Sequence, residues 1–190
     1  MSEKSNFLKQ LQGASGNRTK VRLTRPFPSE RNINGFIVSI GRSLIILQQF
    51  HDFYCEGYAA LRIADIIGFR SGKYERFWEQ MLASEKLLEN IGLPCKASPD
   101  SIFELLKSLR SRELLITVEI ESEVSEDDDD FNFGKIVDLN PHAVSMLCLS
   151  ALGIWDRKPT VILIEKISVV QFDTPYGNIF SRYARQSENP

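Results

Sequence analysis

Histidine and cysteine are scarce in this chain, which has two histidines and three cysteines among its 190 residues. Cys55, Cys95 and Cys148 are odd in number and widely spaced, and no C-x-x-C pair occurs. This pattern argues against a disulfide framework and against a zinc ribbon. Each cysteine has apolar or aromatic neighbours in the sequence, where a free thiol usually behaves as a small core side chain. We therefore predict free thiols and a reducing, cytoplasmic location.

Long hydrophobic runs are also absent. No uncharged apolar run approaches the ~18 residues that a membrane-spanning helix requires. The N-terminal 17 residues contain no continuous apolar segment of the kind found in a secretory signal. With 43% apolar and 25% charged residues, the composition is that of a globular protein. We expect no contact with a membrane.

Motifs that identify enzyme classes are missing as well. The chain has no H-E-x-x-H, P-loop, G-x-G-x-x-G or G-x-S-x-G motif. A Cys–His pair drawn from Cys55, Cys148, His51 and His142, with Asp52 as the orienting group, is the only enzymatic hypothesis the residues offer. Buried thiols and histidines in turns are the simpler interpretation. We therefore predict a protein that is not an enzyme, with no catalytic residue, no cofactor and no bound metal.

One pattern of short strands occurs twice in the sequence. Aligning Gly35 with Gly134 places Ile37 opposite Ile136, and each glycine begins an apolar segment that a polar turn separates from a second apolar run. Before each glycine, at 20–24 and at 115–121, polar and apolar residues alternate with a period of two, which indicates a strand. The sequence therefore predicts an internal duplication of a β-rich unit.

Each copy also ends in the same way. The first copy reads I-x-x-I at Ile63 and Ile66, the second reads I-x-x-I at Ile164 and Ile167, and another strand follows closely in both. A connection this short predicts a tight turn or a single 3₁₀ turn. Five short strands with one such turn are typical of a small Sm-like or SH3-like barrel. A barrel of ~60 residues is marginally stable alone, so we expect the segment between the copies to complete the core.

Between the copies the apolar spacing changes to about 3.6 residues, which indicates helix. The first predicted helix, within 74–94, buries a face that includes Phe77, Trp78 and Met81 and ends at Gly92. A second helix is expected to begin with Ser98 as its N-cap and to end near residue 112.

The predicted fold is mainly β, in the α+β class, with two Sm-like or SH3-like five-stranded small barrels joined by a helical hairpin. The first 19 residues are expected to form a flexible arm or a short helix. The predicted domains are an N-terminal arm at 1–19, a first barrel at 20–76, a helical connector at 77–112, a second barrel at 113–184 and a C-terminal tail at 185–190.

The chain resembles a group of uncharacterised bacterial proteins over roughly residues 20–183. The resemblance rests on "FGKIV" (133–137), "WDRKPT" (155–160), the later "ISVVQF" and "YGNIF", and on "EGYAALRIADI" (56–66). Glu56 stands where an Asp is usual in that group. The resemblance implies a duplicated Sm-like fold, and it implies no activity.

Charge is divided unevenly along the chain. Residues 1–76 have twelve Lys and Arg against six Asp and Glu, a net charge of +6, whereas residues 113–190 have six against fourteen, a net charge of −8. The run Glu119–Asp130 holds eight of these acids. A solvated loop is the simpler interpretation of this run and a calcium site is the alternative, although Ca²⁺ needs converging oxygens and usually a glycine. We expect opposite charges to meet within the chain or in a homodimer.

Two surfaces are candidates for binding. The basic residues of the first copy could contact RNA, with nearby aromatic rings as stacking partners; they are Arg18, Lys20, Arg22, Arg25 and Arg31. The loops after the third strand of each copy carry large apolar side chains, which are favoured anchors in protein interfaces; they are Phe53, Tyr54, Ile154 and Trp155. A solvated basic face and apolar residues folded over the barrel mouths are the simpler interpretations.

The preferred hypothesis is a non-enzymatic binding protein of a regulatory or immunity type that docks an unknown protein partner. RNA binding through the basic first copy is the rival from another class. A Cys- or His-dependent enzyme is the least favoured of the three.

Overall fold

The computed structural model describes residues 3–27, 32–121 and 130–185. The ten strands of this part of the chain form one large antiparallel sheet that is not closed, with the order β5-β1-β2-β3-β4-β10-β6-β7-β8-β9. Its first five strands are β1 (Lys20–Thr24), β2 (Asn32–Ile40), β3 (Leu44–His51), β4 (Tyr54–Arg62) and β5 (Gly68–Arg70). The other five are β6 (Ile116–Ile120), β7 (Asp130–Leu139), β8 (Ala143–Cys148), β9 (Thr160–Leu163) and β10 (Val169–Phe172). The prediction of a mainly β protein is confirmed.

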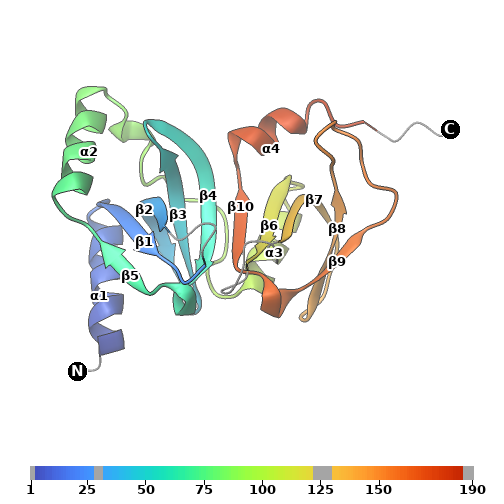
Figure 1. Ribbon diagram of the computed structural model, residues 1–190, viewed down its shortest axis with the longest axis horizontal. Coiled ribbons are helices and arrows are strands. Elements are labelled where there is room, and N and C mark those ends of the chain that lie inside the picture. The colour runs from blue at the N-terminus through green and yellow to red at the C-terminus, as the bar shows by residue number, and fades with distance from the viewer. Residues whose placement is uncertain (1–2, 28–31, 122–129, 186–190) are drawn as a thin grey trace.

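The sheet consists of two halves with the same internal strand order. β5-β1-β2-β3-β4 of the first half corresponds to β10-β6-β7-β8-β9 of the second half. The halves meet where β4 pairs with β10, over four residue pairs from Tyr58↔Phe172 to Leu61↔Val169. Figure 1 shows the two halves side by side with β4 and β10 between them.

Several local features occur at matching places in both halves. Each fourth strand leads into a 3₁₀ turn, η1 (Ile63–Asp65) or η4 (Ile164–Lys166), as the I-x-x-I pattern predicts. The register of β2 on β3 shifts between Ile37 and Ser39, and that of β7 on β8 shifts between Ile136 and Asp138. Gly35 and Gly134 stand two residues before these shifts, where a Cβ would collide with the backbone of the neighbouring strand.

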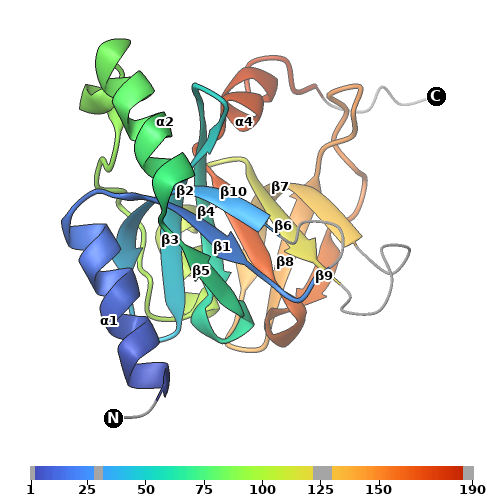
Figure 2. The same cartoon turned by 60° about the vertical axis from the view of Figure 1, so that its left-hand side comes forward.

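The N-terminal segment is a helix. The arm predicted at 1–19 forms α1 (Glu3–Gly16), and the second of the two possibilities, a helix, is the correct one. Leu11 and Ala14 of α1 are buried against the apolar side chains of the first half, including Val21 and Ile45. Figure 2 shows α1 and α2 (Lys73–Ser84) beside the first half and α4 (Pro175–Phe180) next to the second half.

The predicted first helix of the connector ends earlier than expected. α2 stops at Ser84, because Lys86 adopts a left-handed conformation with φ 58°. The Lys86 N–H donates to Ala83 O and the Leu87 N–H donates to Leu82 O, which is the hydrogen-bond pattern of a Schellman motif. A separate 3₁₀ turn, η2 (Leu88–Asn90), follows. Helix termination at Gly92 was therefore a wrong prediction.

The second helix begins later than expected. α3 (Ile102–Arg110) has Ser101 as its N-cap, whose hydroxyl accepts from the Glu104 N–H at 3.2 Å. The predicted cap, Ser98, is wrong because the segment after it is held by a strand: the Leu44 N–H donates to Pro99 O at 3.1 Å. α2 contacts β1 of the first half, whereas α3 contacts β7 of the second half.

The core is continuous across the join. Four α3 side chains, Ile102, Leu105, Leu106 and Leu109, are buried in a cluster that draws strand residues from both halves, such as Leu44 and Val170. Within the described residues, no helix is long and apolar enough to cross a lipid bilayer.

Candidate functional site

An apolar groove runs along the outer face of α2. It has a volume of about 540 Å³. Its lining comes from the β3–β4 turn, from α2 and from the segment after α2; these residues are Phe53, Phe77, Gln80, Met81, Ser84, Glu85 and Leu87. We call this hollow the α2 groove. Its lining is more apolar than that of the hollow around Lys20 and Arg22.

The sequence of α2 explains why a groove forms there. Glu75 and Leu82 are buried toward the sheet, which turns Phe77, Gln80, Met81 and Ser84 to the outside at the spacing of one helical face. Phe77 is 59% exposed, so the prediction that it belongs to the buried face is wrong. Phe77 therefore contributes to an apolar surface together with Phe53, Met81 and Leu87, and not to the core.

The β3–β4 turn forms the other wall. Asp52 has a left-handed conformation with φ 48°, which allows the chain to reverse between β3 and β4. The Phe53 ring lies on the Trp78 ring of α2 with the centroids 4.6 Å apart. Phe53 is therefore held in place as a wall of the groove. Its neighbour Tyr54 is 77% exposed at the start of β4.

The other two predicted anchors lie in the other half. Trp155 is half-buried, with the Lys135 ammonium 4.8 Å from its ring centroid, and Ile154 is half-buried and bridges to Arg185. Both belong to the connection between β8 and β9, on the opposite side of Figure 1 from α2. The four predicted protein-binding residues therefore do not form a single surface.

The predicted basic face is dispersed. Lys20 and Arg22 line a hollow of about 310 Å³ together with Arg70, Tyr74 and Trp78. The Lys20 ammonium lies 4.0 Å from the Trp78 ring centroid. Burial lowers the pKa of Lys20, against the opposing effect of the nearby carboxylates of Glu75, Asp52 and Glu79.

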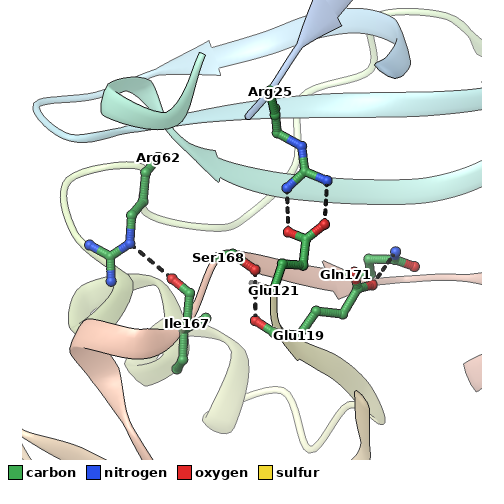
Figure 3. Close-up of polar contacts among 7 residues, drawn as sticks. All are labelled: Arg25, Arg62, Glu119, Glu121, Ile167, Ser168 and Gln171. Atoms are coloured by element: carbon green, nitrogen blue, oxygen red, sulfur yellow. Dashed lines mark hydrogen bonds and ion pairs between the residues drawn. The ribbon is translucent and has the colours of Figure 1, made fainter. Parts of the chain in front are cut away.

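The remaining predicted basic residues lie elsewhere. Arg18 is exposed at the end of α1, and Arg31 lies outside the described residues. Arg25 is fully buried, and its guanidinium donates to both carboxylate oxygens of Glu121 at 2.5 and 2.8 Å. Figure 3 shows this pair bridging the two halves. Arg25 therefore cannot contact RNA in this structure.

The acidic run is likewise not a single loop. Glu119 accepts a hydrogen bond from Gln171 at 2.7 Å, and Glu121 is paired with Arg25. Residues 122–129 of the run lie outside the described part of the chain. Within that part, no group of three or more His, Cys, Asp and Glu side chains is placed to hold a metal ion.

The histidines and cysteines are separate from one another. His51 is exposed near the Asp52 carboxylate at 3.9 Å, and His142 is exposed in the turn before β8. The Gln48 carboxamide, not a histidine, donates to the Cys55 thiol at 3.5 Å. Burial raises the pKa of the Cys95 and Cys148 thiols, which is opposite to the shift of an activated nucleophile.

Comparison with known protein families, with curated proteins and with solved structures finds no match to this chain. A functional proposal therefore rests on the surfaces described above.

Proposed function

We propose that this chain is a non-enzymatic binding protein that docks a partner protein in the α2 groove. The observation that carries the proposal is the exposed Phe77 beside Met81, walled by a Phe53 ring that Trp78 holds in position. Aromatic residues and methionine are enriched in protein interfaces. A wall that is already fixed before binding lowers the entropy cost of association.

The occupant that fits the α2 groove is an amphipathic helix of a partner. The spacing of Phe77, Gln80, Met81 and Ser84 offers one helix face to another, the mode in which a helix lays its apolar side into a groove. Met81 is unbranched and adapts to the shape of the incoming side chains. Glu85 at the end of α2 complements a basic residue on the partner.

We also propose that the fold is a duplicated Sm-like unit, as in the bacterial proteins that the sequence resembles. The matching strand order, 3₁₀ turns and register shifts support it. Each half also has a helix before its first strand and a helix after its fifth, so α2 closes the first unit and α3 opens the second. Arg18 and Glu113, between the opening helix and the first strand of each half, both have positive φ.

Affinity capture from the native host tests the docking proposal. The wild type, a Phe77→Glu variant and a matched Tyr183→Glu variant are compared by quantitative mass spectrometry. Tyr183 is an exposed aromatic residue that does not line the groove. We expect a protein that the wild type and Tyr183→Glu retain and Phe77→Glu loses. Equal recovery by all three would contradict docking in the groove.

Binding of single-stranded RNA is the second candidate function. Lys20, Arg22 and Arg70 lie around one hollow with the Tyr74 and Trp78 rings, a combination suited to a phosphate beside a stacked base. The ratio of absorbance at 260 and 280 nm of the purified protein separates the two proposals. A raised ratio that Arg22→Ala abolishes would favour RNA. We further propose a cytoplasmic, regulatory or immunity-type role without catalysis.

A further inference from the structure

A separate hollow lies where the two halves of the sheet meet. It has a volume of about 380 Å³, within the range of small-molecule sites. Gln49 of β3, Thr117 of β6 and Gln171 of β10 line it, and so do the exposed rings of Phe131 and Tyr176. We call it the junction pocket. None of its lining residues belongs to the α2 groove.

Two of the polar side chains that line the pocket are open to it. Gln49 and Thr117 are only 9% and 5% exposed. Within the described part of the chain, neither side chain has an atom among the fully buried polar atoms that lack a partner, so the Gln49 carboxamide and the Thr117 hydroxyl face the pocket rather than the core. A ligand in the pocket can therefore form hydrogen bonds with both.

The Gln171 side chain, which also lines the pocket, has a fixed orientation. The Gln171 Nε2 donates to Glu119 Oε1 at 2.7 Å, as Figure 3 shows. An ionised carboxylate can only accept, so the nitrogen must face Glu119 and the Gln171 oxygen is left as an acceptor. The Ser168 hydroxyl donates to the Glu119 carbonyl at 3.0 Å and steadies this strand. The pocket therefore offers one oriented acceptor and two groups that can both donate and accept.

The charge of the pocket restricts the ligand. Glu56 is the one charged residue among the described residues that line it, and no lysine or arginine does so. A phosphate group would find no cation there and would be repelled by the Glu56 carboxylate. A neutral ligand is therefore favoured.

We propose that the junction pocket binds a neutral heterocycle with an amide-like edge, the chemistry of an unphosphorylated nucleobase or nucleoside. Glutamine side chains recognise such edges through paired donors and acceptors. The Phe131 and Tyr176 rings provide flat surfaces on which a base can stack. This ligand is distinct from the partner of the α2 groove.

Saturation-transfer NMR and calorimetry on the full chain test the proposal, with adenosine, uridine, their 5′-monophosphates and glucose as probes. We expect saturable binding of at least one nucleoside, weaker binding of its monophosphate and none of glucose. Phe131→Ala should weaken the nucleoside about tenfold, since stacking contributes ~1–3 kcal/mol per base. Thr117→Val, which removes only the hydroxyl, should weaken it about threefold.

Matched controls separate this result from unfolding and from the docking proposal. Tyr183→Ala removes another exposed aromatic ring, outside the pocket, and Phe77→Ala changes the α2 groove. Both should bind the nucleoside as the wild type does, and melting temperatures show which variants are folded. No saturable binding of either nucleoside would overturn the proposal. So would binding of glucose, or affinity that a folded Phe131→Ala and a folded Thr117→Val leave unchanged.

Discussion

At the scale of single residues, the ion pair between Arg25 and Glu121 links the basic and acidic parts of the sequence. Both side chains are almost completely buried, at 0% and 3% exposed, and the carboxylate receives two hydrogen bonds from the guanidinium. A bidentate pair of this kind is geometrically specific. It neutralises one charge from each half inside the molecule, as expected for opposite charges that meet within the chain.

Removing one partner of this pair should be far more costly than removing both. We expect Arg25→Met or Glu121→Leu alone to lower the free energy of unfolding by ~3–5 kcal/mol, because each leaves a buried charge without its partner. The double variant should recover most of that loss. Urea denaturation of the wild type, the two single variants and the double variant measures this double-mutant cycle. Single losses of under about 1 kcal/mol, as for an exposed pair, would contradict the burial seen here.

Glu75 makes stability depend on pH. Burial would raise the pKa of Glu75, but the hydrogen bonds from Arg70 and from the Gly72 N–H outweigh it and hold the pKa below its usual value. Because the folded pKa is lower than the unfolded one, this stabilisation is present above the unfolded pKa and is lost as pH falls through the folded pKa.

Glu75→Gln should therefore destabilise the protein at neutral pH by ~1–3 kcal/mol, the usual effect of losing a charged hydrogen bond. The difference from the wild type should shrink in acid, below about pH 4. Chemical denaturation across pH measures both effects, with Glu85→Gln at the exposed end of α2 as the control. A difference that is the same at pH 7 and pH 3.5 would show that the carboxylate charge plays no part.

At the scale of elements, the two strand glycines permit close approach of neighbouring strands. A Cβ at Gly35 would collide with the Gln48 carbonyl of β3, and one at Gly134 with the Leu147 carbonyl of β8. Gly13 in α1 has open space where a methyl group would stand, with nothing from outside its own helix within 4 Å, and serves as the contrasting glycine. The same substitution can therefore test both close approaches.

Gly35→Ala and Gly134→Ala should each lower the free energy of unfolding by ~1–3 kcal/mol or more, as overpacking does. Gly13→Ala should raise it by up to ~1 kcal/mol, because alanine favours a helix more than glycine does. Thermal and urea unfolding of the three variants measure these shifts. A strand variant as stable as the wild type would mean that the close approach is not required.

The strands were predictable from the sequence and the helix ends were not. Alternation at 20–24 and the I-x-x-I patterns depend on neighbouring residues, so the sequence contains the signal. α2 ends in a Schellman motif with Lys86 where glycine is usual, and α3 starts late because β3 holds Pro99. The Thr174-Pro175 pair was an available signal for α4, since Thr174 caps the helix and Pro175 is its first residue. Phe53 was predicted as a binding residue and does line the groove. Phe77 was assigned to the buried face of the helix, because an apolar residue fits a buried face and an interface equally well.

At the scale of the whole molecule, the pairing of β4 with β10 determines which surfaces exist. This contact joins residues more than a hundred positions apart and is accompanied by hydrogen bonds from Arg62 to Ile164 O and Ile167 O. Long-range pairing of this kind leaves no local pattern in a sequence. It creates the junction pocket and separates Trp155 from Phe53, so neither result could be derived from the order of the residues.

The uneven charge predicts salt-dependent association. Changing Asp127, Asp128, Asp129 and Asp130 to Asn removes four charges from the acidic part of the sequence, and only Asp130 of the four lies among the described residues. We expect less self-association at low salt in this variant and little of the salt sensitivity of the wild type, because exposed charges are screened over ~8 Å at physiological ionic strength. Sedimentation profiles that are identical for both proteins at low and high salt would show that these four charges take no part in association.

Site-specific photo-cross-linking in the native host tests docking in the α2 groove most directly. A photoreactive phenylalanine analogue replaces Phe77 in one protein and Tyr183 in a matched control, both exposed aromatic positions. We expect one defined protein adduct at position 77, absent at position 183 and lost when Met81→Glu is added. Adducts that are the same at both positions, or an adduct at 77 that survives Met81→Glu in a folded protein, would contradict docking in the groove.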